Sequence, residues 1–329
     1  MSCAGARGAE VVRFGLAGTG IHGGRYVAHL LAGEVAGASL GAISRADAQE
    51  GSLFALGHNV TFVADPRELA TFPGLDAVIA CLPPDLHAEV AIACLEAGRP
   101  VLVEKPMAAS PEEARRIAEA AARTGTPLMV GHTLRFDPLI VALRNACRTI
   151  GPIRMIAINQ RFEPTSRSWI DTPGRGGAIL NTGVHAFDLL RYLSGAEIVS
   201  IQAAAARVVT SQTEDEFAAL VRLEPGGILA TVDNARTTEG RSGRVEVAGA
   251  KAQLRADHVH RELHRIEGRQ RIDLGAFPAV PTVAEALRAF TACLASGQPM
   301  PVSAEDGEAA VRAAAAASRA AHTLDSICP

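Results

Sequence analysis

The sequence lacks the paired cysteines and the long apolar runs that mark several classes of protein. Its six cysteines are scattered, and none stands in a Cys-x-x-Cys arrangement. This argues against a metal or dithiol site, and we expect reduced thiols. No segment reaches about 18 uninterrupted apolar residues, and the first ten residues carry one arginine but no apolar stretch of a signal peptide. We therefore expect a cytoplasmic protein that does not span a membrane.

The chain also lacks an excess of charge of either sign. It has 32 basic and 35 acidic residues, which gives a net charge of −3 at pH 7. Such a balance argues against nucleic acid as the main partner, and we expect a small-molecule substrate. The 329 residues, 48% of them hydrophobic, suffice for two domains with sizeable cores.

The first part of the chain alternates short apolar strands with helices. Helix starts carry clear signals, as in Ser110-Pro111-Glu112-Glu113, and Asp65-Pro66-Arg67-Glu68 repeats that chemistry. Strands alternating with helices predict an α/β fold with a doubly wound parallel sheet, so we expect a Rossmann dinucleotide-binding domain over residues 1–131. The expected strands are 11–17, 39–43, 60–63, 76–81, 100–103 and 127–131.

A glycine-rich turn follows the first of these strands. Gly18 permits a tight turn, Gly20 lets the backbone approach a pyrophosphate, and Gly23 allows the next helix to lie close to the strand. The amino terminus of that helix offers N–H groups and a partial positive charge to the phosphates. The turn therefore predicts a dinucleotide site. Its candidate residues are Gly18, Thr19, Gly20, Ile21, His22 and Gly23.

The end of the second strand bears on the choice of dinucleotide. Enzymes that use NAD commonly carry an acidic residue about twenty residues after the glycines, where this chain has Ser44-Arg45. A hydroxyl followed by a guanidinium would bind a 2′-phosphate, so we expect NADP as the cofactor, with NAD possible. In the alternative, Arg45 is a solvated loop residue and both cofactors are accepted.

Two further strand ends carry candidate cofactor contacts. The apolar run Val101–Val103 stops at Glu104-Lys105-Pro106, because proline cannot continue a strand. Lys105 therefore lies at the carboxyl edge of the sheet, where open parallel sheets bind their ligands. The alternative is that Glu104-Lys105-Pro106 forms a surface turn without a functional role. The candidates at these two strand ends are Leu82, Pro83, His87, Glu104 and Lys105.

The second part of the chain, residues 132–329, has a different pattern. A helix over 136–148 is followed by strand-like runs with few helices between them, which predicts an α+β domain with a large, mainly antiparallel open sheet. One face of such a sheet should pack on helices. The other, if apolar, would need a partner subunit. The expected strands are 153–162, 198–209, 216–223, 227–233, 244–247 and 252–255.

A glycine-rich stretch precedes a helix in this second domain. Apolar residues recur at helical spacing from Gly183, so we expect a helix that starts near Thr182 or Gly183. His185 would then lie in the first turn, with Asn181 at or before the cap. The alternatives to a functional role are a helix cap for Asn181 and a packed ring for His185.

Other polar residues of the second domain are weaker candidates. Arg161 and Trp169, the only tryptophan, could line a sugar site by hydrogen bonds and by stacking; Trp169 could equally pack its own loop. We expect no metal ligands, because no second histidine or cysteine stands at a paired spacing. Three histidines do lie close in sequence, but their segment is charged and we expect them to be solvated. They are His258, His260 and His264.

Together these motifs resemble the glucose-fructose oxidoreductase and inositol dehydrogenase family (Gfo/Idh/MocA). The resemblance spans nearly the whole chain and rests on the glycine turn, Pro83 four residues before His87, the Glu104-Lys105-Pro106 strand end and the later glycine-histidine stretch. It implies that Lys105 reaches both substrate and nicotinamide, that His185 is catalytic and that Asn181 contacts substrate. It also implies an oligomer, dimer or tetramer, built through the antiparallel sheet. The family commonly has aspartate where this chain has Asn181, which cannot carry charge.

From this we expect a dehydrogenase or reductase that acts on a secondary alcohol, or the matching ketone, of a sugar, cyclitol or related polyol. His185 would accept the hydroxyl proton while Lys105 stabilises the developing alkoxide. Three alternatives remain. One is an elimination that amounts to hydrolysis of a glycoside with a tightly held dinucleotide, another is reduction of an imine or enone on the same scaffold, and the third is a cofactor-binding regulator without catalysis.

Overall fold

The computed structural model describes residues 11–164 and 168–323, which fall into two compact units. The first consists of the segments up to Ala108, Glu112–Gly131 and Val283–Glu305. The second consists of Ala109–Pro111, His132–Thr282 and the segment from Asp306 onward. Apart from residues 109–111, the chain thus passes to the second unit at residue 132, returns to the first for residues 283–305 and then enters the second again.

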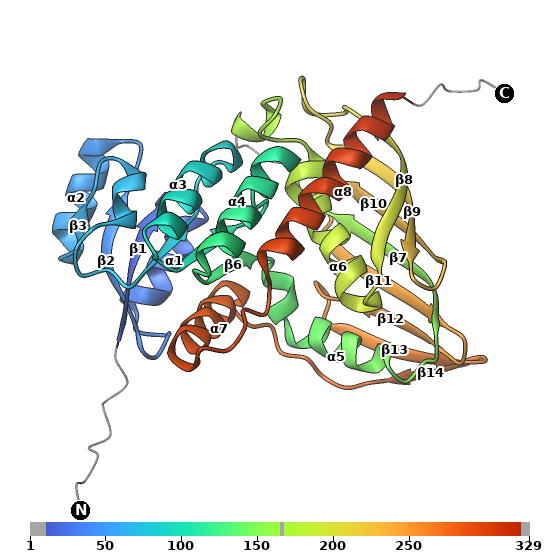
Figure 1. Ribbon diagram of the computed structural model, residues 1–329. Helices are drawn as coiled ribbons and strands as arrows, with labels where there is room; N and C mark the ends of the chain where they lie inside the picture. The colour runs from blue at the N-terminus through green and yellow to red at the C-terminus, as the bar shows by residue number, and fades with distance from the viewer. Residues whose placement is uncertain (1–10, 165–167, 324–329) are drawn as a thin grey trace, which may run out of the picture. The chain divides into compact units, whose positions relative to one another are not determined.

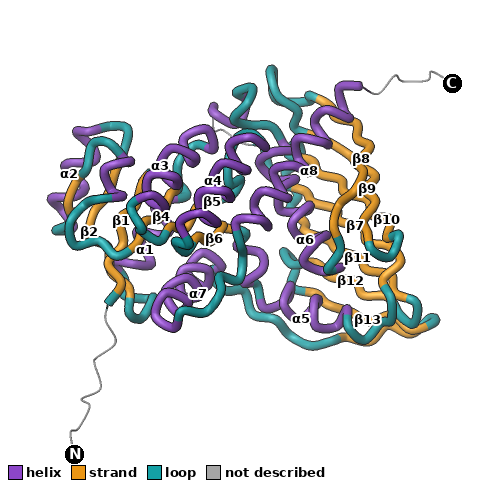
Figure 2. The backbone as a smooth tube through the Cα atoms, viewed as in Figure 1, coloured by secondary structure: helices purple, strands orange, loops and turns teal. Residues whose placement is uncertain are grey.

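The first unit is built on a six-stranded sheet in which every neighbouring pair is parallel. The strand order is β3-β2-β1-β4-β5-β6. Strands β2 and β3 extend the sheet to one side of β1, and β4, β5 and β6 extend it to the other side. Strands β4, β5 and β6 are buried along their whole length because helices cover them, as Figure 2 shows. The predicted doubly wound sheet is confirmed. The strands are β1 (Val12–Ala17), β2 (Ala38–Ser44), β3 (Thr61–Phe62), β4 (Ala77–Ala80), β5 (Val101–Glu104) and β6 (Leu128–Gly131).

Helical segments connect these strands. The predicted start at Asp65 is followed only by a 3-10 turn of five residues, although Asp65 does accept a hydrogen bond from the N–H of Arg67. The segments are α1 (Gly23–Leu31), α2 (Ala48–His58), η1 (Pro66–Ala70), α3 (Pro84–Glu96), α4 (Pro111–Thr124) and, from the later return of the chain, α7 (Thr282–Ser296).

The second unit contains an eight-stranded sheet in the order β14-β13-β12-β11-β7-β10-β9-β8. Only the pair β7 and β10 is parallel, so the prediction of a mainly antiparallel sheet is confirmed. The strands are β7 (Ile153–Arg161), β8 (Glu197–Ala206), β9 (Glu216–Glu224), β10 (Ile228–Ala235), β11 (Ser242–Gly249), β12 (Gln253–Asp257), β13 (Glu262–Glu267) and β14 (Gln270–Asp273).

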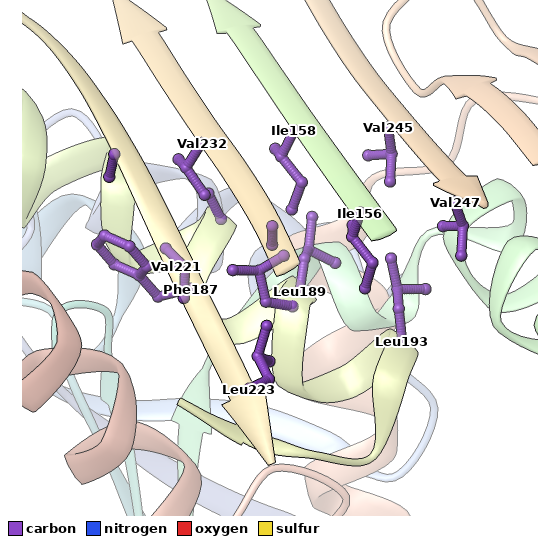
Figure 3. Packing of buried hydrophobic residues seen from close by; sticks show 14 of the residues in the cluster. Ile156, Ile158, Phe187, Leu189, Leu193, Val221, Leu223, Val232, Val245 and Val247 are labelled. Atoms are coloured by element: carbon purple, nitrogen blue, oxygen red, sulfur yellow. The ribbon is translucent and has the colours of Figure 1, made fainter. Parts of the chain in front are cut away.

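Helices cover one face of this sheet (Figure 1). Alternate residues of the strands turn toward them, and Figure 3 shows Ile156 and Ile158 of β7 packed with Phe187, Leu189 and Leu193. This apolar layer fixes the helix that carries His185. The helical segments of the unit are η2 (Thr133–Phe136), α5 (Pro138–Cys147), η3 (Ser168–Asp171), the π-turn η4 (Ile179–Gly183), α6 (Val184–Ser194) and α8 (Ala304–Thr323).

The other face of the sheet carries exposed apolar side chains. Met155 and Leu229, paired across β7 and β10, are 45% and 48% exposed, and Leu220 on β9 is 46% exposed. We call the surface formed by Met155, Leu220 and Leu229 the open-face patch. No helix in the described parts of the chain is long and apolar enough to cross a membrane.

The histidine-rich segment forms strands that the sequence analysis did not delimit. β13 and β14 contain few apolar residues, so the alternation of apolar and polar residues that marks a strand is weak in them. The prediction that all three histidines are solvated is wrong for two of them. The Nε2 atom of His258 is buried beside Gly243, where a Cβ atom would lie 2.1 Å from it, and the side chain of His264 is only 12% exposed. His260 is exposed as predicted.

Candidate active site

The glycine turn between β1 and α1 has the shape that a pyrophosphate requires. Gly18 has φ +93°, and a Cβ atom there would lie 2.3 Å from the carbonyl oxygen of Cys81. A Cβ atom at Gly23 would lie 1.8 Å from the carbonyl oxygen of Gly18. Both positions therefore exclude any other residue. At Gly20 a Cβ atom would meet nothing within 4 Å, so the backbone there is open to a ligand.

The same turn fits a dinucleotide on chemical grounds. Helix α1 begins at Gly23 and has no acidic residue in its first turn that would repel a phosphate. The hydroxyl of Thr19 is buried in the turn, and within residues 11–164 and 168–323 it has no hydrogen-bond partner. A bound phosphate is the kind of acceptor that such a hydroxyl needs. Gly18 to Gly23 would thus hold the pyrophosphate of a dinucleotide.

The two residues at the end of β2 differ in accessibility. Ser44 is buried, and its hydroxyl donates a 3.5 Å hydrogen bond to the carbonyl oxygen of Ala64. Arg45 is partly exposed and forms an ion pair with Glu50 in the first turn of α2. Its Nη1 also donates a 3.4 Å hydrogen bond to the carbonyl oxygen of Thr19. Arg45 is therefore joined to the glycine turn and paired with a carboxylate that the sequence analysis missed.

Glu104 lies at the centre of a buried cluster that connects the glycine turn with Lys105. Its carboxylate accepts a 2.6 Å hydrogen bond from the Tyr26 hydroxyl, lies 2.9 Å from His22 Nε2, and accepts a 2.9 Å hydrogen bond from the N–H of Lys105. Burial acts to raise the pKa of Glu104, but His22 and Tyr26 outweigh it and lower this pKa to about 2. Burial, with the Glu104 charge, raises the pKa of Tyr26. The cluster keeps a charged carboxylate beneath the site.

His87 connects the turn at Leu82-Pro83 with the Glu104-Lys105-Pro106 segment. Its Nε2 accepts a 3.2 Å hydrogen bond from the N–H of Leu82, so its Nδ1 carries the proton and donates to the carbonyl oxygen of Pro106 at 2.9 Å. Burial lowers the pKa of His87, in keeping with this neutral form. Pro83 stands at the start of α3. His87 thus fixes the Leu82 turn against the end of the Glu104-Lys105-Pro106 segment.

In the second unit, Asn181 lies inside a π-turn that runs directly into α6. Its N–H donates to the carbonyl oxygen of Gly177 at 3.0 Å, and no side chain caps the start of the π-turn or of α6. The reading of Asn181 as a helix cap is therefore wrong, because the helical turn begins before it. The next residue, Thr182, donates to Asn234 Oδ1 of β10 at 3.0 Å. This bond fixes the π-turn on the helix-covered face of the sheet.

His185 has a second histidine beside it. The rings of His132 and His185 are 6.1 Å apart, centroid to centroid, and meet edge to face at 78°. Behind them, Asp188 Oδ2 lies 4.0 Å from His132 Nδ1, and its carboxylate accepts 2.6 and 3.0 Å hydrogen bonds from Arg135. Asp188 is buried, and the two hydrogen bonds from Arg135 satisfy its carboxylate there. The sequence analysis missed His132, although it directly follows a strand.

The structure does not bring Arg161 together with Asn181 and His185. Arg161 is the last residue of β7 and forms a 2.5 Å ion pair with Asp233. It lines a groove of about 450 Å³ on the open sheet face, whereas its neighbour Gln160 is buried on the helix-covered face and accepts from Asn234. For Trp169 the structure describes the backbone in η3 and leaves the side chain outside the described part.

Comparison with known proteins identifies the family. Residues 12–132 match the model of an oxidoreductase family with an NAD-binding Rossmann fold, and residues 145–255 match the GFO/IDH/MocA C-terminal domain. An inositol 2-dehydrogenase of Rhizobium meliloti (strain 1021) is 32% identical over 323 residues, which cover 94% of this chain and 96% of that protein. The chain belongs to the Gfo/Idh/MocA family.

Two other similarities fit this Gfo/Idh/MocA membership. Inositol 2-dehydrogenase 1 of Saccharopolyspora erythraea is 36% identical over 218 residues, and the match spans 64% of this chain and 61% of that protein. The crystal structure of a UDP-N-acetylglucosamine 3-dehydrogenase from Acidithiobacillus ferrooxidans has the same fold. It superposes with a TM-score of 0.82 and 24% identity, covering 94% of this chain and 97% of that one. The chain is an NAD(P)-binding oxidoreductase of this family.

Proposed function

We propose that the protein is a dehydrogenase or reductase that transfers hydride between NAD(P) and a secondary alcohol, or the matching ketone, of a sugar, cyclitol or related polyol. The observation that carries the proposal is the Glu104 cluster, which fixes the backbone of Lys105 at the carboxyl edge of a sheet whose glycine turn fits a pyrophosphate. The names of the similar inositol dehydrogenases support the substrate class. Free thiols at Cys81, Cys94, Cys147 and Cys293 suit the cytoplasmic location that we propose with it.

The residues of the chain then have distinct roles. A bound nicotinamide supplies the hydride acceptor or donor. Lys105 donates a hydrogen bond to the reacting oxygen and stabilises the negative charge that grows on it during oxidation. His185 accepts the hydroxyl proton, and in reduction it returns a proton to the same oxygen. Asn181 donates to, or accepts from, a substrate hydroxyl without adding charge.

The test of this function is a screen of sugars and cyclitols with NADP⁺ and NAD⁺. Absorbance at the reduced nicotinamide band should rise with at least one polyol, and gel filtration should separate the protein from added dinucleotide. Dinucleotide that stays bound, together with glycoside cleavage in place of a rise in absorbance, would contradict the proposal in favour of the elimination reaction.

The preference between dinucleotides gives a first prediction. Since Arg45 directly follows β2, its guanidinium should bind the 2′-phosphate in a charge-assisted contact, and NADP⁺ should bind about tenfold more tightly than NAD⁺. Calorimetric titration of the protein with each dinucleotide measures this ratio. Equal affinities, or tighter binding of NAD⁺, would remove the argument from Arg45.

A second prediction concerns assembly. We propose that two or more copies associate through the open-face patch, because its exposed apolar side chains would gain from leaving water. Light scattering should then give a multiple of the 34.2 kDa chain mass, and Leu229→Arg should reduce it toward a single chain. Leu56→Arg, on the exposed surface of α2 in the first unit, is the matched control and should leave the mass unchanged. A wild-type mass of one chain would contradict the proposal.

A further inference from the structure

The ion pair between Arg45 and Glu50 lies at the carboxyl end of β2. Arg45 is the first residue after β2, the position from which Rossmann folds recognise the adenosine ribose. NADP carries a phosphate on the 2′ oxygen of that ribose, and NAD carries a hydroxyl. A positive group at this position favours the phosphate, whereas a carboxylate favours the hydroxyl.

The fold holds the two members of this pair in place. Asp47 caps α2 and accepts a 2.9 Å hydrogen bond from the N–H of Glu50, which sets Glu50 in the first helical turn. Arg45 is held from the other side by its bond to the carbonyl oxygen of Thr19 in the glycine turn. The side chains of Arg45 and Glu50 are 33% and 59% exposed, so a ligand can reach both.

We propose that Glu50 is a specificity-determining residue that limits the preference for NADP. To bind a 2′-phosphate, Arg45 must share its guanidinium with a second anion or leave Glu50, and the carboxylate repels the phosphate. For NAD the same carboxylate accepts a hydrogen bond from the 2′-hydroxyl. The charge on residue 50 therefore sets the ratio of the two affinities. This inference rests on the proposed NAD(P)-dependent function and adds the residue that tunes its cofactor choice.

The experiment compares Glu50→Gln with wild type by calorimetric titration of NAD⁺ and NADP⁺. Glutamine keeps the length of the side chain and removes its charge, so the ratio of the two affinities should move toward NADP⁺ by about tenfold. Arg45→Gln should abolish the advantage of NADP⁺. The double variant should have an affinity ratio between those of the two single variants, because the lost guanidinium and the lost carboxylate act in opposite directions. Glu119→Gln is the matched control, since Glu119 forms an exposed ion pair with Arg115 on α4. Its affinity ratio should equal that of wild type.

The outcomes separate this inference from the function on which it rests. If wild type and Glu50→Gln bind both dinucleotides with the same affinity ratio, Glu50 does not determine specificity and the inference is overturned while the function stands. If wild type binds neither dinucleotide, the proposed function is overturned and the inference with it. Because Glu50 is exposed, the variant should keep the thermal unfolding midpoint of wild type to within a few degrees.

Discussion

Replacement of Lys105 by alanine is expected to lower the catalytic rate by roughly a hundredfold or more. An ammonium group that hydrogen-bonds the reacting oxygen acts most strongly when negative charge has built up there, so its loss raises the barrier more than it weakens substrate binding. The backbone at this position should survive the change, because the N–H of Lys105 remains bonded to Glu104. Dinucleotide binding should survive as well, since the glycine turn does not depend on the lysine side chain.

The measurement is steady-state turnover with the best polyol from the screen, together with calorimetric titration of the dinucleotide. Lys251→Ala is the matched control, because Lys251 is an exposed lysine in the turn between β11 and β12. It should retain wild-type turnover. A Lys105→Ala variant with near-normal turnover would show that the Glu104-Lys105-Pro106 segment is a structural turn and that another group stabilises the reacting oxygen.

The parts of the fold that follow from local signals could be predicted. The strands of the first unit are short apolar runs separated by helix starts, and each signal lies within a few residues. The glycine turn could also be predicted from the spacing of its glycines after a strand. That spacing is a local signal, because the backbone near Gly18 and Gly23 leaves no room for a Cβ atom. The end of β5 at Glu104 follows in the same way from Pro106.

The parts that depend on distant contacts could not be predicted. Glu104 meets His22 and Tyr26, which lie 82 and 78 residues away in sequence, and no local pattern joins an acidic strand end to a glycine turn. The contact between His132 and His185 likewise joins residues that are far apart in the sequence. Arg161 lies on the exposed face of the sheet, whereas Asn181 and His185 lie on elements that cover the other face. Side chains alternate along β7, so a shift of one residue moves a candidate to the other face.

The charge of Glu104 should also be visible in the stability of the protein. The pKa of Glu104 is lowered from 4.5 to about 2 in the folded protein, while in the unfolded chain it should be close to 4.5. A lowered pKa means that the folded state favours the charged form. Its contribution to the free energy of unfolding is therefore fully present above about pH 4.5 and is lost as the pH falls toward 2. The size of the shift corresponds to roughly 3 kcal/mol.

The prediction is tested by urea unfolding of wild type and Glu104→Gln between pH 2 and pH 7. Above pH 5 the variant should be less stable by roughly 3 kcal/mol, since glutamine keeps the shape of the side chain but loses the charge that His22 and the Lys105 N–H stabilise. The difference should shrink steadily below pH 4.5 and nearly vanish at pH 2. Glu96→Gln is the matched control, because Glu96 is paired with Arg123 on an exposed surface, where water screens the pair. Its effect should be much smaller at every pH. A difference between wild type and Glu104→Gln that stays constant from pH 7 to pH 2 would mean that packing around the side chain, rather than its charge, stabilises this cluster.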